Sequence, residues 1–248
     1  ALSMAESIEV YEPSSYHETV TYDESVQWLV AMNEEIESLH KNHTWELVKP
    51  PKGQKIVGNK WVFKKKEGIP EVEAARFKAR VVAKGYCQKK GIDFNEVFSP
   101  VVKHSSIRVL LAMVALFDME LEQLDAKTAF LHGELEEQIY MHQPEGFVVP
   151  GKEDHVCLLK KSLYGLKQSP RQWYKRFDSF MIDHGYSRSD YDSCVYHKRF
   201  HDGSSVYLLL YVDDMLIASK NKSEIQKLKS QLNGEFEMKD LGAAKKIL

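Results

Sequence analysis

Two adjacent aspartates, Asp213 and Asp214, separate two apolar runs and constrain the fold more than any other feature of the chain. The runs Val206–Val212 and Met215–Ala218 are rich in β-branched and aromatic residues, which predicts two buried strands. The connection contains neither Gly nor Asn, so tight primed-turn chemistry does not explain the acids. Neighbouring carboxylates beside an apolar hairpin repel each other, and the usual relief is a hard divalent cation, Mg2+ or Mn2+. The alternative is a solvated hairpin tip whose acids keep a sheet edge soluble.

The charge of the chain is distributed unevenly. Its 248 residues are 43% hydrophobic and 28% charged, which is typical of a soluble globular protein with one large domain or two small ones. The net charge is only −2, yet the stretch from Gly53 to Gly91 holds eleven basic and three acidic residues, a net of +8. Such a stretch favours a phosphate-facing surface, with a merely solvated hairpin as the alternative.

Cysteine usage and hydropathy exclude several classes of protein. Cys87, Cys157 and Cys194 are widely spaced, which argues against a zinc site or a disulfide framework and favours a reducing compartment. The longest apolar run, Val109–Phe117, is too short for a membrane span of about 20 residues, and no signal peptide is evident. We therefore expect no membrane association. The chain begins without Met, and we expect it to be a piece of a longer protein.

The first half of the chain predicts a lead-in, a helix and a basic hairpin. Residues 1–21 are polar and are expected to be flexible. Asp23 is the expected cap of a helix. Its expected apolar stripe consists of Val26, Leu29, Val30, Asn33, Ile36 and Leu39. A strand is predicted at Trp45–Val48. Two further strands, at 60–64 and 77–83, are joined through the turn region Gly68-Ile69-Pro70.

The second half alternates strands with helices. An apolar helix beginning at Ser105 or Ser106 is expected to be buried, and the strand after it ends at Asp125. Further helices are predicted from a Ser169 cap with Pro170 in the first turn, and from a Ser223–Gln226 capping box. The first of these two helices is expected to end at Gly185, and its expected inward stripe is Trp173, Phe177, Phe180 and Met181.

Between these helices, Asp202-Gly203 predicts a hairpin of two strands. Apart from an insertion after Asp125, the order is strand, helix, strand, strand, helix, strand. This order predicts an α+β fold with an antiparallel, ferredoxin-like split βαβ sheet. In that sheet the ends of the central strands are neighbours, so Asp125 is expected to lie near Asp213 and Asp214.

Three carboxylates at the ends of two neighbouring strands suit two metal ions about 4 Å apart. Such a pair serves in-line displacement at phosphorus. The acids alone leave open whether the reaction is nucleotidyl transfer or phosphodiester hydrolysis.

The segments around the acids resemble those of reverse transcriptases. Tyr211–Met215 resembles their Y-x-D-D box, and Leu124–Gly133 resembles their first catalytic motif. Ser162–Trp173 is similar to the version found in Ty1/copia-type retrotransposons. The segments 60–64, 76–85 and 98–101 are also similar to that version, and the likeness runs from about Tyr22 to Leu248.

This resemblance implies a right-hand polymerase fold. Residues 22–104 would form a fingers-type region after the 1–21 lead-in. Residues 105–248 would form the palm, with part of the fingers inserted after Asp125. The family's thumb would be absent, and the chain would stop before the primer grip. The resemblance also implies RNase H and integrase elsewhere in a Pol polyprotein, and copying in cytoplasmic virus-like particles, with the nucleus as the other compartment.

The resemblance also implies roles for individual residues. Asp125, Asp213 and Asp214 would be catalytic and, with the backbone of Ala126, would hold two Mg2+ (or Mn2+) ions. Phe130 would stand under the incoming sugar and exclude a 2′-hydroxyl, with ordinary core packing as the alternative.

Other candidates concern the nucleotide and the nucleic acid. Candidates for gripping the triphosphate are Lys64, Lys65, Lys78 and Arg80, and the strand register decides which face each occupies. Tyr164 and Gly165 would line the nucleotide pocket, although a plain loop glycine is an equal alternative for Gly165. The residues expected to meet nucleic acid are Lys167, Arg171, Tyr211 and Met215, with surface solvation as the alternative for Lys167 and Arg171.

The predicted function is that of an RNA-directed DNA polymerase core, which joins dNTPs to the 3′-hydroxyl of a DNA primer on an RNA template. The first alternative is a truncated, inactive retroelement remnant that at most binds nucleic acid. The second is a two-metal nuclease, for which Phe130 would have no role in sensing the sugar.

Overall fold

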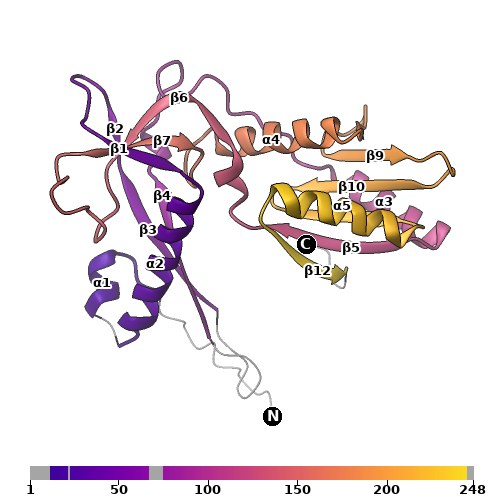
Figure 1. Cartoon of the computed structure of the whole chain (residues 1–248), viewed down its shortest axis with the longest axis horizontal. Coiled ribbons are helices and arrows are strands. Elements are labelled where there is room, and N and C mark those ends of the chain that lie inside the picture. The colour runs from indigo at the N-terminus through magenta and orange to yellow at the C-terminus, as the bar shows by residue number, and fades with distance from the viewer. Residues whose placement is uncertain (1–11, 22, 67–74, 245–248) are drawn as a thin grey trace, which may run out of the picture. The chain divides into compact units, whose positions relative to one another are not determined.

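A computed structural model of the chain describes residues 12–21, 23–66 and 75–244 (Figure 1). The chain divides into two compact units. Unit 1 comprises Ala1–Phe94 and Leu135–Lys167, and unit 2 comprises Asn95–Glu134 and Gln168–Leu248. The segment inserted after Asp125 thus largely belongs to unit 1, whereas residues 95–104 belong to unit 2. Both units combine helices with mainly antiparallel sheets, so the α+β class is confirmed. The predicted turn at Gly68-Ile69-Pro70 lies outside the described residues.

Unit 1 is built around a two-stranded hairpin and a four-stranded sheet. The hairpin pairs β3 (Asn59–Lys66) with β4 (Arg76–Ala83), as predicted. The sheet has the order β1-β7-β6-β2, and its strands are β1 (Trp45–Val48), β7 (Val156–Lys161), β6 (Glu134–Met141) and β2 (Ile56–Val57). A short 3-10 helix, η1 (Gly85–Cys87), follows β4. Helix α2 (Ser25–Lys41) packs on β4 (Figure 1).

The apolar stripe of α2 is rotated from the predicted one. Trp28, Met32 and Leu39 are fully buried, whereas Val26 and Val30 are exposed. The aromatic ring of Trp28 decides this orientation, because it packs edge-on against two rings of the hairpin at centroid distances of 5.4 and 4.8 Å. A large aromatic side chain buries more apolar area than a valine, so burial of Trp28 has the larger effect on which face of α2 points inward.

Part of the predicted flexible lead-in is helical, and its residues 1–11 lie outside the described residues. A short helix, α1 (Tyr16–Thr21), lies within the stretch expected to be a flexible lead-in. The N-cap of α2 is Glu24 and makes no side-chain capping bond, so the capping role expected of Asp23 is wrong.

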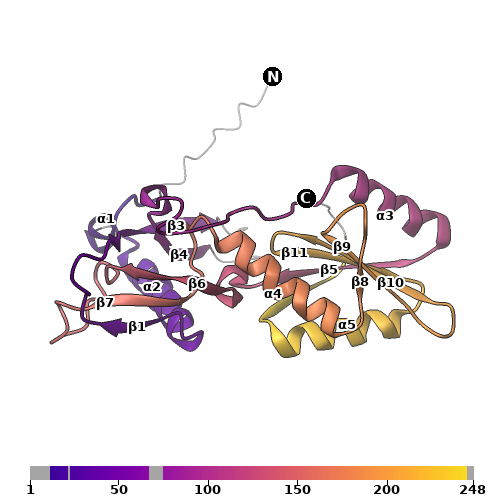
Figure 2. The same ribbon diagram turned by 90° about the horizontal axis from the view of Figure 1, so that it is seen from above.

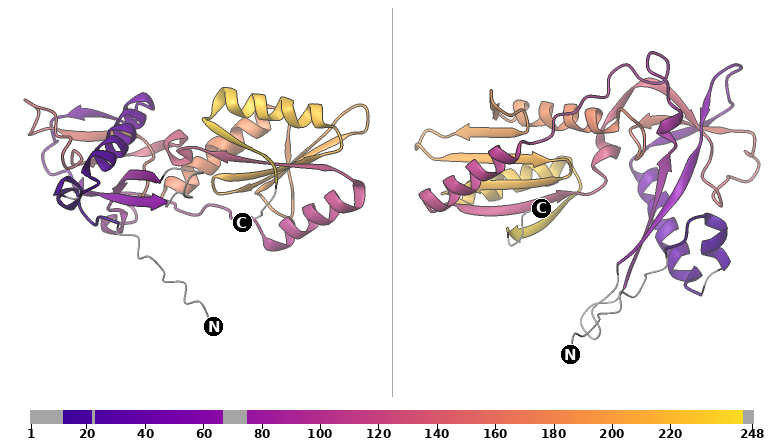
Figure 3. Two further views of the ribbon diagram at one scale, coloured as in Figure 1. Left: turned by 90° about the horizontal axis from the view of Figure 1, so that it is seen from below. Right: turned by 180° about the vertical axis from the view of Figure 1, so that it is seen from behind.

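Unit 2 has a six-stranded sheet with the order β12-β5-β11-β10-β9-β8. Its strands are β5 (Glu120–Ala126), β8 (Ser187–Arg188), β9 (Val195–Arg199), β10 (Ser205–Tyr211), β11 (Asp214–Ser219) and β12 (Met238–Ala243). With the helices α4 (Ser169–Asp183) and α5 (Lys222–Glu235), the order β5-α4-β10-β11-α5-β12 and the neighbours β12-β5-β11-β10 reproduce the predicted split βαβ arrangement. Helices α4 and α5 cover one face of this sheet, and α3 (His104–Phe117) lies against the other (Figures 2 and 3).

Helix α3 is not the buried helix that its apolar sequence predicted. Only Leu110 is buried, and Val109, Leu116 and Phe117 are 58%, 76% and 46% exposed. Ile107 and Val114 pack against the core of unit 2 and are only partly buried, and more than half of the residues of the helix are exposed. Its first turn is held by a distant acid, Asp192, whose carboxylate accepts bonds from the Lys103 amide (2.9 Å) and the Ser106 hydroxyl (2.6 Å).

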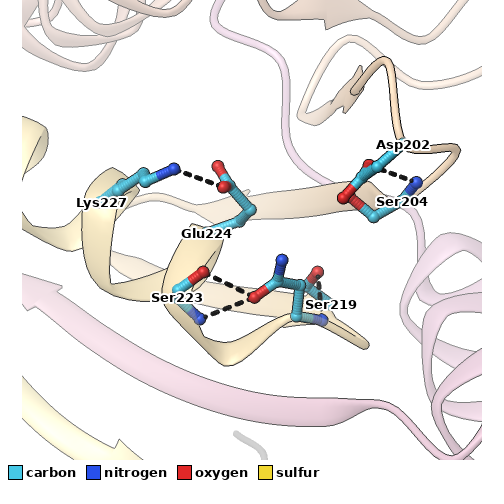
Figure 4. A network of polar contacts seen from close by, with 7 residues as sticks. Asp202, Ser204, Ser219, Ser223, Glu224 and Lys227 are labelled. Atoms are coloured by element: carbon cyan, nitrogen blue, oxygen red, sulfur yellow. Dashed lines mark hydrogen bonds and ion pairs between the residues drawn. The ribbon is translucent and has the colours of Figure 1, made fainter.

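The other helix ends of unit 2 differ by a few residues from those predicted. The residue before α4 is Gln168 rather than Ser169, although Pro170 occupies the first turn and Gly185 follows the end of the helix in the left-handed conformation. Its inward stripe is confirmed, since all four predicted residues are buried. Helix α5 is capped by Asn221, which accepts bonds from the amide and hydroxyl of Ser223, in place of a Ser223–Gln226 box. The Asp202-Gly203 hairpin is confirmed, with Asp202 bonded to the Ser204 amide (Figure 4).

Within the described ranges, no helix has the length and apolar character needed to cross a membrane.

Candidate active site

The strand register of unit 2 brings the three acids to one place. In the antiparallel pair of β5 and β11, Asp125 lies directly opposite Asp214. Directly opposed residues of such a pair point to the same face, with Cβ atoms about 4.5–5.5 Å apart. Asp213 lies next to them, in the turn between β10 and β11. Asp125 and the adjacent pair Asp213 and Asp214, which follows it 88 residues later, therefore share one end of two central strands.

The turn that carries Asp213 is tight and strained. Tyr211 pairs with Asp214, so only Val212 and Asp213 connect the strands. Val212 has φ +58°, as expected of the first central residue of a type II′ turn, a position that favours Gly. For a β-branched residue this conformation is an outlier and costs about 1–3 kcal/mol. A tight turn thus forms where the sequence argued against one, because other elements hold it.

Two hydrogen bonds from neighbouring elements hold this turn. The Ala126 amide at the end of β5 donates to the Asp213 carbonyl at 2.8 Å. The Trp173 indole Nε1 on α4 donates to the Val212 carbonyl at 2.6 Å. Successive carbonyls of the turn are therefore each fixed by a different part of unit 2.

The acids influence one another electrostatically. Burial raises the pKa of Asp214, and the negative charges of Asp213 and Asp125 raise it further. The amide Nε2 of Gln123, 3.4 Å from Asp214 Oδ1, acts in the opposite direction. The raised pKa shows that the ionised form of Asp214 is disfavoured by its surroundings, which a bound cation would reverse.

The donor set suits a hard divalent cation. Carboxylate oxygens, with backbone carbonyls, are the ligands that Mg2+ and Mn2+ prefer. Among the described residues, no three His, Cys, Asp or Glu side chains lie close enough together to hold a metal ion. The acids are thus adjacent through their backbone register, while their carboxylates are not drawn together as a preformed cluster.

The raised pKa of Asp214 has a consequence for stability that depends on pH. A carboxyl whose pKa is raised by folding binds protons more tightly in the folded state, so ionisation costs stability as pH rises above its ordinary value of 3.8. In metal-free buffer we expect Asp214→Asn to raise the free energy of unfolding at pH 7, by less than about 1 kcal/mol because the group is partly solvated. This gain should shrink as pH falls towards 3.8. Urea denaturation of both proteins between pH 4 and 8 measures it, and a gain independent of pH would contradict the assignment.

Phe130 lies in unit 2, five residues after Asp125 in the sequence. It belongs to a short 3-10 helix, η2 (Ala129–His132), which follows β5 after the left-handed Thr128 (φ +51°). Its ring is half-buried and packs against the core of unit 2. Phe130 also lines a cavity of about 60 Å³ together with Val212 and Trp173. The Phe130 ring packs in the core and is also partly accessible. Its surroundings are therefore compatible both with ordinary core packing and with a contact to the incoming sugar.

In unit 1, the register of the β3–β4 hairpin separates the four candidate cations. Lys64 lies opposite Lys78 and Val62 lies opposite Arg80, so Lys64, Lys78 and Arg80 share the outer face. That face carries six cations in all: Lys60, Lys64, Lys66, Arg76, Lys78 and Arg80. Lys65 is on the other face, where its Nζ pairs with Glu24 at 2.7 Å. Lys64 also forms an ion pair, with Glu12 at 2.9 Å.

The loop after β7 rests against β4 within unit 1. The guanidinium of Arg80 stacks over the Tyr164 ring, with Cζ 4.6 Å from the centroid, and the Tyr164 carbonyl accepts a bond from the Ala83 amide at 2.8 Å. Gly165 has φ +90°, and a Cβ there would lie 2.1 Å from the Ala83 carbonyl oxygen. Close packing against β4 therefore explains this glycine without any ligand.

The residues expected to meet nucleic acid have different surroundings. In unit 1, Lys167 is exposed, and its ammonium lies 5.1 Å from the centroid of Phe94. In unit 2, Arg171 donates to the Phe98 carbonyl at 3.2 Å, and Tyr211 is 39% exposed. Met215 has no exposed surface and belongs to the hydrophobic core of unit 2.

Three residues of the site were missed as functional candidates. Val212 gave no signal, because its strain arises only when the strands close the turn. Gln123 stands two positions before Asp125, and the alternation of a strand was a usable signal that it shares a face with that acid. Trp173 was assigned only to the core, and nothing in the sequence indicates where its N–H points.

Comparison with known proteins gives one consistent family. The sequence profile described as "Reverse transcriptase (RNA-dependent DNA polymerase)" matches residues 42–248. The chain is 58% identical over 238 residues, 96% of its length, to the "Retrovirus-related Pol polyprotein from transposon TNT 1-94" of Nicotiana tabacum. It is 40% identical over 215 residues, 86% of its length, to the corresponding polyprotein from transposon RE1 of Arabidopsis thaliana.

A yeast protein extends the likeness to a more distant group. The "Transposon Ty1-MR1 Gag-Pol polyprotein" of Saccharomyces cerevisiae is 28% identical over 236 residues, 90% of the chain. The chain spans only 18%, 14% and 12% of the lengths of these three relatives. The similarity therefore concerns one part of each polyprotein.

Proposed function

The chain belongs to the reverse transcriptase (RNA-dependent DNA polymerase) family, in the form carried by Ty1/copia-type retrotransposons, and on this premise we propose that it is the RNA-directed DNA polymerase core of such an element. The reaction is transfer of a nucleotidyl group from a dNTP to the 3′-hydroxyl of a DNA primer on an RNA template. The observation that carries the proposal is the register of β5 and β11, which sets Asp125 opposite Asp214 beside the turn that bears Asp213. In this proposal unit 2 is the palm and unit 1 is a fingers-type region.

Asp125, Asp213 and Asp214, with the backbone of Ala126, would hold two Mg2+ or Mn2+ ions. Bound there, these ions supply charge neutralisation at the α-phosphate and a more nucleophilic primer oxygen. The chain's own contribution is to keep mutually repelling carboxylates together, with Asp125 and Asp214 on the paired strands β5 and β11 and Asp213 in the adjoining turn. The pKa of Asp214, which is raised by burial and then by the negative charges of Asp213 and Asp125, is consistent with this assignment.

The remaining residues would handle the nucleotide and the template. On the outer face of the unit 1 hairpin, Lys64, Lys78 and Arg80 would bind phosphate, whereas Lys65 lies on the other face, where it pairs with Glu24. Tyr164 stacks under Arg80 and would fix the direction of that guanidinium. Phe130 would lie under the incoming sugar and exclude a 2′-hydroxyl. Lys167, Arg171 and Tyr211 would contact the template or primer, which makes binding steeply dependent on salt.

The relatives are named as Pol polyproteins, and we propose that this chain likewise functions beside RNase H and integrase segments in a cytoplasmic particle. A primer-extension assay distinguishes this function from the two alternatives, an inactive retroelement remnant and a two-metal nuclease.

Extension of a DNA primer annealed to an RNA template tests the proposal. We expect dNTP-dependent extension in Mg2+ and none in EDTA. Binding of the primer–template without extension supports the inactive-remnant alternative. Cleavage of the nucleic acid without added dNTP supports the nuclease and contradicts the polymerase.

A further inference from the structure

We propose that Trp173 is a positioning residue, whose indole N–H locks the strained Val212–Asp213 turn and so sets the direction of the catalytic carboxylates. The inference rests on the proposed function of the acids. It adds a component that lies on α4, outside the strands that carry those acids.

The Trp173 side chain is rigidly held. It is 1% exposed, and its ring packs against Phe177, Phe236 and His132 at centroid distances of 5.6, 5.2 and 5.9 Å. Packing on several sides fixes both the position and the tilt of the indole. Its N–H is therefore a fixed donor, and its 2.6 Å bond to the Val212 carbonyl transmits that rigidity to the turn.

The hydrogen bond from Trp173 restrains the peptide plane that immediately precedes Asp213. The Val212 carbonyl belongs to the peptide plane before the Asp213 Cα, and the Asp213 carbonyl belongs to the plane after it. The first plane is held by Trp173 and the second by the Ala126 amide, at 2.8 Å. Both rotatable backbone bonds of Asp213 are thus restrained from outside the turn, which restricts where its carboxylate points.

Strain explains why the turn needs this donor. The positive φ of Val212 disfavours the observed conformation, and no glycine relieves it. Without the indole bond, the peptide between Val212 and Asp213 has an accessible route to a relaxed conformation. A carboxylate displaced by a fraction of an ångström binds metal and substrate in a less productive geometry.

Unit 1 offers a matched control. Trp61 is also buried, 4% exposed, and its indole Nε1 also donates to a backbone carbonyl, that of Glu145 at 2.9 Å. Replacing either tryptophan by phenylalanine removes the same atoms and the same kind of hydrogen bond. The two variants should therefore lose comparable thermal stability, and only Trp173→Phe should affect the turn.

The first measurement needs no catalysis. By NMR hydrogen exchange in EDTA, we expect the Ala126 amide, which donates to Asp213, to exchange about tenfold faster in Trp173→Phe than in Trp61→Phe, since about one hydrogen bond is lost at the turn. The second measurement is primer extension. We expect kcat to fall about tenfold in Trp173→Phe, with the KM for dNTP within about twofold of the unmodified chain. Equal exchange and equal kcat in the two variants would overturn the proposal.

A double-mutant cycle tests the role of strain. Glycine adopts positive φ freely, so Val212→Gly removes the need for a restraint. In that background we expect Trp173→Phe to lower kcat by less than about threefold. A tenfold loss in both backgrounds contradicts the strain account.

An isosteric substitution covers the case in which Trp173→Phe does not fold. Benzothienylalanine at position 173 keeps the shape of the side chain and lacks the N–H donor, and it should reproduce both effects. If the unmodified chain proves inactive in primer extension, the proposed function fails, and the Ala126 exchange rate still decides whether Trp173 restrains the turn.

Discussion

Asp125→Asn and Asp213→Asn are each expected to abolish extension of a primed RNA template in Mg2+, with rates lower by on the order of 10³-fold or more. Asparagine keeps the size of aspartate and removes its charge, so the change removes a metal ligand with little effect on packing. Removing either charge also relieves repulsion on Asp214, whose pKa is raised by burial and by the charges of both neighbours. We therefore expect the variants to unfold at the same temperature as the unmodified chain or slightly higher.

Asp183→Asn is the matched control, because Asp183 is an exposed aspartate at the last residue of α4. Its rate should stay within about twofold of the unmodified chain, as expected for a surface substitution. A metal-dependent shift in melting temperature gives a readout independent of catalysis. Mg2+ should stabilise the unmodified chain by mass action and stabilise Asp125→Asn much less. Normal extension by either acid variant would show that these carboxylates are not the catalytic ligands.

Phe130→Val is expected to relax the choice of sugar. If the Phe130 ring lies under the ribose, shortening the side chain opens space for a 2′-hydroxyl, and the dNTP-over-rNTP ratio of kcat/KM should fall by about 10–200-fold. Most of this change should come from faster use of rNTPs. Single-nucleotide incorporation with matched dNTP and rNTP pairs measures the ratio directly.

Phe200→Val is the control for the loss of buried ring area. Phe200 is also partly buried against the core of unit 2, and it precedes β10 at the end of that strand away from the acids. Both variants should lose stability, on the order of 1–3 kcal/mol. Only Phe130→Val should change sugar selectivity. Unchanged selectivity would leave Phe130 with a packing role alone and would favour the nuclease alternative.

Much of the architecture of unit 2 was predictable from local pattern. The apolar runs on either side of Asp213 and Asp214 indicated β10 and β11, and the order of elements indicated the split βαβ sheet. The inward stripe of α4 was also predictable, because four large apolar residues recur at helical spacing. These features depend on residues close together in the sequence, where periodicity is informative.

The predictions that differ from the structure concern features that depend on contacts between residues distant in sequence. The apolar sequence of α3 predicted a buried helix, yet Leu110 is its only buried residue. The stripe of α2 was misjudged because the two hairpin rings that receive Trp28 lie 35 and 49 residues away. Glu24 and Lys65 pair across 41 residues, on the hairpin face opposite to that of Lys64, Lys78 and Arg80, and the sequence did not indicate this pairing. Such pairings depend on register and packing, which composition does not encode.

The sequence by itself determined the identity and order of the three acids and the family to which their segments belong. Side-chain chemistry and local hydrophobic pattern are sufficient for both. Only the tertiary structure decided that Asp125 lies opposite Asp214, that Val212 adopts positive φ, and that Trp173 and Ala126 hold the two peptide planes around Asp213. The physical reason is that a strained turn is stable only when donors from other elements reach it, and their positions follow from the packing of the whole unit.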